Sequence, residues 1–194
     1  MDFKDIKTPE ELMKWLDENF EYGVIDNKGK KIQNGEEFQK ACNKYWKVRP
    51  VLEIIRSKVG HCYDQTELER YWFTKNGYKI KTFWVATYHK NSYTMCHAYL
   101  AYLNNNKWYY FEHSDGYNRG IYEFDKLQDL IEFQAKLMIK SSKAEQPNLK
   151  LSVCTNCFKK PKCHISMKEY REFVTSSKEV LDKSEEELNN GLSC

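Results

Sequence analysis

The chain has 194 residues, 41% of them hydrophobic, and a formal net charge of +3 from 31 basic and 28 acidic side chains. This apolar content can build a core, which excludes intrinsic disorder, and the length predicts one domain with a small C-terminal addition. The charge is too balanced to indicate a nucleic-acid partner. No apolar run approaches the roughly 20 residues needed to cross a bilayer, so no membrane partner is expected.

The seven cysteines are irregularly placed and odd in number, so they do not form a disulfide framework. The first residues contain no apolar core of a signal peptide. Together these features predict a reducing, cytoplasmic location. Cys194 is expected to lie in a frayed tail.

The first helix is predicted to begin at Pro9. Thr8 can cap it, Pro9 suits the first helical position, and Glu11 three residues after Thr8 completes a capping box. Its buried face would be formed by Leu12, Trp15, Leu16 and Phe20.

Residues 22–32 contain an Asn-Lys-Gly turn and fit either a short hairpin or a loop. A second helix is predicted to begin at Asn34, which is the cap, and to end before Pro50. Residues 51–58 fit a further short helix that leads into a turn at Gly60.

Cys62 is placed where this turn runs into another helix, which Gly77 ends. Backbone N–H groups without an intrahelical partner point out of a helix N-terminus, and the partial positive charge there favours thiolate over thiol. Asp64 and Glu67 lie in the same first turns and oppose a further anion. We therefore expect that a nearby imidazolium is needed to hold Cys62 as a thiolate.

Three aromatic and β-branched segments follow, at residues 79–88, 95–103 and 107–112, and are predicted strands. If Asn104 and Asn105 form a two-residue turn, His97 pairs directly with Glu112 on one face of the sheet. A three-residue loop would instead place His97 opposite His113. Cys96 is one residue off the face that carries His97, so it should point away from the site.

A cysteine at a helix N-terminus, a strand histidine and a carboxylate on the next strand form a nucleophile system in which the acid orients the imidazole. The runs Val59-Gly60-His61-Cys62-Tyr63-Asp64, Cys96-His97-Ala98-Tyr99 and Trp108-Tyr109-Tyr110-Phe111-Glu112-His113-Ser114 resemble the transglutaminase-like superfamily in order and spacing. The segment Phe20-Glu21-Tyr22-Gly23 is similar to the tyrosine-bearing segment that precedes the nucleophile in bacterial members.

This resemblance implies a triad of Cys62, His97 and Glu112 in a papain-like core. The usual acid of the family is Asp followed by Pro-Thr, so Asp115 is an alternative to Glu112. His113 and His89 are alternative bases. The tryptophan that stabilises the oxyanion in animal transglutaminases has three candidate replacements, which are Tyr22, Tyr45 and Trp46.

The C-terminal part is expected to be less regular. A loop at residues 115–120 and an edge strand at 121–124 precede a helix from Asp125 to about Ile139, and residues 141–150 fit a connection. A final helix is predicted from Ser166, extending as far as Leu188. Four metal-capable side chains lie between these helices and could hold a structural zinc, the alternative being ordinary surface or core cysteines: Cys154, Cys157, Cys163 and His164.

The predicted fold is α+β, with a nucleophile helix packed on an antiparallel sheet, flanking helices, a catalytic domain over residues 1–140 and a C-terminal segment over 141–194 packed on it. The expected function is acyl transfer on amide bonds of a peptide or protein, without a cofactor. Hydrolysis is favoured over transamidation because no long apolar tunnel is evident. The alternative is an inactive module of the same fold that binds a peptide or nucleic acid.

Overall fold

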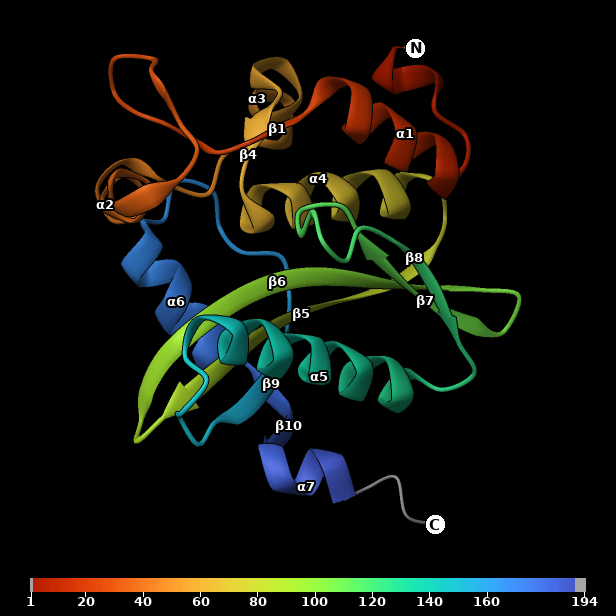
Figure 1. Cartoon of the computed structure of the whole chain (residues 1–194). Coiled ribbons are helices and arrows are strands. Elements are labelled where there is room, and N and C mark those ends of the chain that lie inside the picture. Colours follow the sequence, from red (N-terminus) through yellow and green to blue (C-terminus); the bar gives the residue numbers. More distant parts are fainter. Residues whose placement is uncertain (1, 191–194) are drawn as a thin grey trace.

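The computed structural model describes residues 2–190 and has an α+β fold built on a six-stranded antiparallel sheet (Figure 1). The order of the strands is β10-β9-β5-β6-β7-β8, so the two C-terminal strands extend the sheet next to β5. The strands are β5 (Lys79–His89), β6 (Ser92–Asn104), β7 (Lys107–Glu112), β8 (Gly120–Phe124), β9 (Ser152–Phe158) and β10 (Lys178–Ser184).

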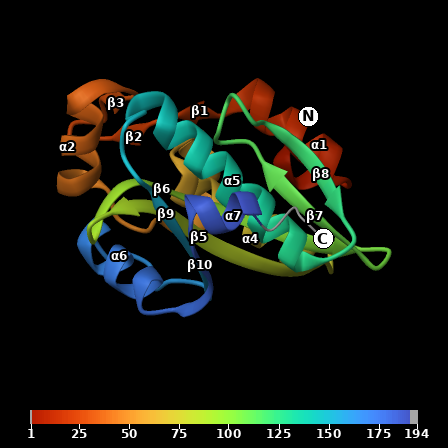
Figure 2. The same cartoon turned by 60° about the horizontal axis from the view of Figure 1, so that its bottom comes forward.

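Helices cover both faces of this sheet (Figure 1). Helix α4 (Cys62–Lys75) packs on one face through a core that includes Leu68, Trp72 and Leu100, and α1 (Pro9–Asn19) and α3 (Val51–Ser57) lie behind it. Helix α5 (Leu127–Glu145) covers the other face, with α7 (Glu185–Asn190) beside it (Figure 2).

A third core joins the N-terminal end of α4 to two further helices, α2 (Gly35–Tyr45) and α6 (Met167–Thr175). Short strand pairs connect the remaining segments: parallel β1 (Glu21–Tyr22) with β4 (Val59–Gly60), and antiparallel β2 (Val24–Ile25) with β3 (Lys31–Ile32). A 3-10 turn, Phe3–Asp5, precedes α1. The turn region at residues 22–32 is therefore a hairpin. No helix in residues 2–190 has the length and apolar content to cross a bilayer.

Local capping signals are confirmed where the sequence contains them. The Thr8 hydroxyl accepts from the Glu11 N–H at 3.2 Å, and the Glu11 carboxylate accepts from the Thr8 N–H at 3.3 Å. All four residues predicted for the buried face of α1 are buried. Helix α2 begins after Asn34 as predicted, although the Asn34 side chain makes no capping bond.

The C-terminal predictions were wrong in three places. Helix α5 begins after Lys126 and continues to Glu145, so the proposed domain boundary at residue 140 falls inside it. The segment of Cys154 and Cys157 is strand β9, not a metal loop, because it pairs with β5 and β10 on its two sides. Helix α6 ends at Thr175 and β10 follows. Cys194 lies outside the described residues.

The hairpin between β6 and β7 turns at Asn105 and Asn106, one residue later than predicted. Both have positive φ, 48° and 61°, as a type I′ turn requires. Leu100 therefore pairs with Phe111, and extending this register would place His97 opposite Ser114 and Glu112 opposite Tyr99. The direct pairing of His97 with Glu112 was wrong, but the two remain on one face because the register moved by two.

Candidate active site

Cys62 is the first residue of α4 and is almost fully buried, with 7% of its surface exposed. The turn before it is fixed at Gly60, where an added Cβ would lie 2.5 Å from the Cβ of Asp64, so no larger residue fits. The parallel pairing of Tyr22 in β1 with Gly60 in β4 brings the segment before the β2–β3 hairpin next to this turn. The N-terminus of α4 is thereby held against a segment 40 residues earlier in the sequence.

Asp64 does not act as the repelling charge that its position in the sequence predicted. Its carboxylate accepts from the Trp46 indole N–H at 2.9 Å and from the Arg49 Nε at 3.1 Å, and its Oδ2 also lies 3.3 Å from the His61 N–H. The guanidinium opposes the negative charge of this carboxylate. Glu67 is likewise paired with Arg70, at 3.2 Å. These ion pairs leave the positive potential of the helix end available to the thiol.

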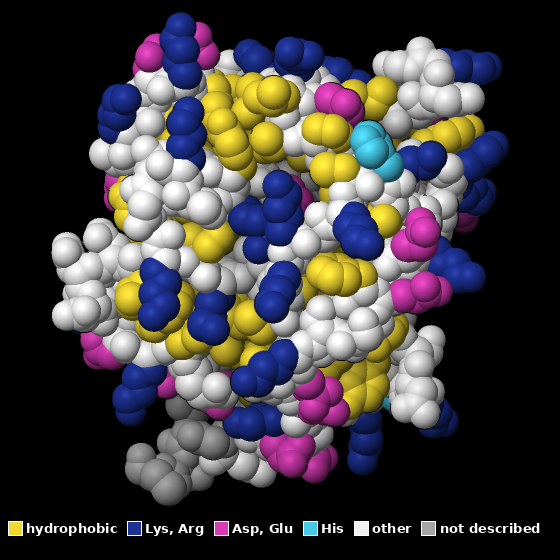
Figure 3. All heavy atoms as spheres, turned by 180° about the vertical axis from the view of Figure 1, so that it is seen from behind, with side chains coloured by type: hydrophobic (Ala, Val, Ile, Leu, Met, Phe, Trp, Pro, Cys, Tyr) yellow, Lys and Arg dark blue, Asp and Glu magenta, His cyan; other side chains and the backbone are white. Residues whose placement is uncertain are grey.

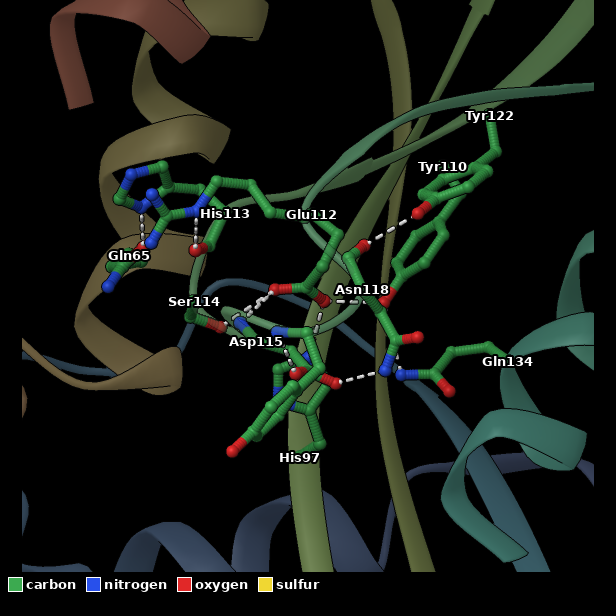
Figure 4. A network of polar contacts seen from close by, with 12 residues as sticks. Gln65, His97, Tyr110, Glu112, His113, Ser114, Asp115, Asn118, Tyr122 and Gln134 are labelled. Carbon is green, nitrogen blue, oxygen red and sulfur yellow. Dashed lines mark hydrogen bonds and ion pairs between the residues drawn. The ribbon is translucent and has the colours of Figure 1, made fainter. Parts of the chain in front are cut away.

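His97 and Glu112 form the expected imidazole–carboxylate pair, with 2.7 Å between Nε2 and Oε2 (Figure 4). This bond occupies Nε2 and leaves Nδ1 for the thiol. Because the β6–β7 ladder stops at Leu100, the edge of β6 is open at His97. His97 and Glu112 are diagonal neighbours, and their side chains are long enough to meet across that distance.

The Glu112 carboxylate is fully satisfied. Besides His97, it accepts hydrogen bonds from the Tyr110 hydroxyl, from the Ser114 hydroxyl at 3.0 Å and from the Asp115 N–H at 2.8 Å (Figure 4). The Tyr110 hydroxyl in turn accepts from Gln134 on α5 at 3.1 Å. Such a network fixes the carboxylate, and through it the imidazole ring.

The protonation states of the three groups support one another. Burial opposes the thiolate form of Cys62, but the imidazoles of His61 and His97 lower the pKa of its thiol to about 6. Burial likewise disfavours imidazolium, yet Glu112 and the thiol together raise the pKa of His97 well above its ordinary value. Despite burial, His97 and the network donors lower the pKa of Glu112 to about 2. The arrangement favours a thiolate–imidazolium pair at neutral pH.

His61 is a further residue of the site, to which the sequence analysis assigned no role. Its Nδ1 accepts from the Tyr63 N–H at 3.1 Å, and its buried Nε2 has no hydrogen-bond partner among the described residues. The ring therefore caps α4 and also contributes to the low pKa of Cys62. Its position directly before the nucleophile was the available signal.

The thiol opens into a pocket of about 80 Å³. Tyr22, Cys42 and Cys96 line it together with Cys62, so the expectation that Cys96 points away from the site was wrong. The Cys96 sulfur lies 3.1 Å from the Tyr63 hydroxyl. The Cys62 thiol faces the open edge of β6. Cys96 and His97 point to opposite faces of the sheet, but at this edge both come close to the thiol.

The alternatives for acid and base lie elsewhere. Asp115 accepts from the Asn118 amide at 2.7 Å and from the Tyr117 N–H at 3.1 Å, as in a local turn. His113 Nδ1 is bonded to Gln65 at 2.7 Å, and burial lowers the pKa of His113 to about 4. His89 Nδ1 lies 2.8 Å from the Lys150 carbonyl oxygen. Among the bases and acids predicted from the sequence, all of which lie within residues 2–190, His97 is the one that lowers the pKa of Cys62, and Glu112 is the acid bonded to it.

The four predicted zinc ligands are not assembled. Cys154 and Cys157 are three residues apart on β9, and they pack into the cores on opposite sides of the sheet. Cys163 and His164 are exposed in the following loop. Within residues 2–190 there is no group of three or more His, Cys, Asp or Glu side chains that could hold a metal ion.

Neither the protein-family models nor the curated proteins compared with this chain gave a match.

Proposed function

We propose that this protein is a cysteine-dependent acyl-transfer enzyme of the transglutaminase-like type, acting on amide bonds of a peptide or protein. The observation that carries the proposal is the 2.7 Å bond of the His97 imidazole to the Glu112 carboxylate, beside a buried Cys62 thiol whose pKa that imidazole lowers. Each member lies on the element that its role needs: a helix N-terminus for the nucleophile and adjacent strands for base and acid.

The chemistry follows from this arrangement. The Cys62 thiolate attacks the amide carbonyl carbon and forms a tetrahedral oxyanion. As the oxyanion collapses, the C–N bond breaks and His97 gives its Nδ1 proton to the leaving amine, which leaves a thioester on Cys62. Water or a second amine then attacks the thioester with His97 as the base, and the thiolate–imidazolium pair is restored. Glu112 stays ionised and keeps the imidazole oriented.

We assign two donors to the oxyanion. The Cys62 N–H is at the first position of α4, where it has no intrahelical acceptor, and the neighbouring Tyr63 N–H is already bonded to His61. Among the three replacement candidates, Tyr22 lines the thiol pocket, whereas the Trp46 indole is committed to Asp64. Tyr45 does not line that pocket. Tyr22 is therefore the second donor in this proposal.

Removing the Tyr22 hydroxyl should slow catalysis without disturbing the nucleophile. We expect Tyr22→Phe to lower kcat by roughly 10²-fold, the typical effect of losing one oxyanion donor, with little change in KM. The control is Tyr45→Phe, which should retain full activity. A Tyr22→Phe enzyme with unchanged kcat would show that this hydroxyl makes no transition-state contact.

Hydrolysis is favoured over transamidation because polar side chains such as Gln39 and Arg171 line the thiol pocket, which is therefore not an apolar tunnel of the kind that would exclude water. The experiment incubates the protein with glutamine-bearing peptides, with and without a labelled primary amine, and reads the products by mass. Cleavage or deamidation that the amine does not change supports a hydrolase. Amine incorporation at the expense of hydrolysis, dependent on Cys62 and His97, would make it a transferase.

A binding module without turnover is the alternative, and a different surface would serve it. Lys and Arg side chains form a loose band between apolar patches on the face opposite that of Figure 1 (Figure 3). If that surface is the functional one, binding of single-stranded nucleic acid should fall with added salt and should not depend on Cys62. Products that form only when Cys62 is present would instead support the enzyme.

A further inference from the structure

A second, larger pocket adjoins the thiol pocket. Its volume is about 410 Å³, and the two pockets share three lining residues, which are Gln39, Cys96 and Arg171. The pockets are therefore parts of one groove that leads away from Cys62. Such a volume lies in the range of sites that hold a small ligand or a few residues of a peptide.

The larger pocket follows the open edge of β6. Four consecutive residues of that strand line it: Tyr93, Thr94, Met95 and Cys96. Residues 92–99 of β6 pair with β5 on one side, and among the described residues no strand pairs with their other side. An edge of this kind presents backbone N–H and C=O groups at alternate residues, to which an extended peptide can add as a further strand.

The groove contains one guanidinium and one carboxylate, and they are placed differently. Arg171 on α6 lines both pockets, whereas Glu145 at the end of α5 lines only the larger one, so the positive charge is nearer to Cys62. Within residues 2–190 the Arg171 guanidinium has no ion pair or side-chain hydrogen bond. Burial raises the pKa values of Cys42 and Cys96, and Arg171 opposes both shifts, so its field reaches the thiol pocket.

We propose that this groove binds the substrate as an extended peptide along the β6 edge, with an acidic side chain paired to Arg171 close to the amide presented to Cys62. A guanidinium without a partner in a groove matches a carboxylate in charge and in bidentate geometry. This inference rests on the proposed function, because it takes the groove as the path of the acyl donor. It assigns Arg171 as the residue that sets the preference for acidic sequences.

The test measures peptide binding in the Cys62→Ala protein, where no turnover can occur. The probes are fluorescein-labelled hexapeptide amides with a central glutamine, in which Asp or its neutral isostere Asn is stepped through the flanking positions. At one position we expect the Asp peptide to bind about tenfold more tightly than the Asn peptide. Arg171→Gln should reduce this preference for the Asp peptide to between about one- and twofold. In the protein that keeps Arg171, added salt should also reduce the preference.

The matched control is Lys168→Gln, which removes an exposed positive charge from the same helix but outside the groove and should leave the ratio unchanged. Equal binding of Asp and Asn peptides at every position would overturn the inference. So would a preference for Asp peptides that is unchanged in Arg171→Gln. A lack of any binding at millimolar peptide would also overturn it. The proposed chemistry fails separately, if wild-type protein forms no Cys62-dependent product from peptides that do bind.

Discussion

Alkylation of Cys62 by iodoacetamide should follow an apparent pKa of about 6, with a rate that is already near its plateau at pH 7. An ordinary thiol, with a pKa of about 8.5, is only a few per cent ionised at that pH. A low-pKa thiolate is intrinsically less nucleophilic, so the advantage of Cys62 over an ordinary exposed thiol should be about tenfold at pH 6 and smaller above it. Mass spectrometry of modified peptides across pH measures this directly.

Cys62→Ala should abolish both this rapid labelling and all product formation. Cys42→Ala is the control, because Cys42 lines the same pocket but burial raises its pKa to about 12, so it should stay unlabelled and its loss should leave activity intact. Rapid labelling that persists in Cys62→Ala, or a midpoint above pH 8 in the wild type, would mean that the imidazoles do not activate this thiol.

Glu112→Gln should have the second large effect, a loss of about 10³- to 10⁴-fold in kcat/KM at neutral pH. Every hydrogen bond to the carboxylate comes from a donor, so the amide NH₂ of glutamine needs the Ser114 hydroxyl or His97 Nε2 to become an acceptor. If Nε2 accepts, the imidazole proton sits on Nδ1 and the ring is in the wrong tautomer to act as the base toward the thiol. Without the negative charge the pKa of His97 falls. The pKa of Cys62 then rises, and we expect the midpoint of alkylation to move upward by at least about one pH unit.

The same variant should change the acid stability in a defined direction. The pKa of Glu112 is about 2 in the folded protein and 4.5 ordinarily, so its contribution to stability is fully present above pH 4.5 and is lost as the pH falls toward 2. A shift of this size corresponds to about 3 kcal/mol in the free energy of unfolding. The difference in stability between wild type and Glu112→Gln should therefore shrink over that pH range.

Asp115→Asn is the matched control for the measurements of activity and of the alkylation midpoint. Asp115 donates its backbone N–H to Glu112, which the substitution keeps, while its side chain is bonded only to the local turn. This variant should retain the alkylation midpoint and most of the activity. If Asp115→Asn lost activity and Glu112→Gln did not, the acid of the triad would have been misassigned.

The sequence by itself determined the features that depend on neighbouring residues. The capping box of Thr8 and Glu11 and the start of α4 at Cys62 follow from spacings of three residues, which act through hydrogen bonds within one helical turn. The side-chain bond between His97 and Glu112 forms although the predicted strand register was wrong. Side chains alternate between the faces of a strand, so a register change of two residues keeps both on one face.

The tertiary structure alone decided what depends on distant partners. The segment of β9 mixes strand-favouring Val, Thr and Phe with Ser, Asn and two Cys, and was not predicted as a strand. It becomes one because β5 and β10 supply hydrogen bonds on both sides. The sequence predicts that the charge of Asp64 opposes the thiolate. In the structure this charge is paired with Arg49, 15 residues earlier. The groove at Arg171 arises only where α6 meets the open edge of β6, and no local spacing reports such a meeting.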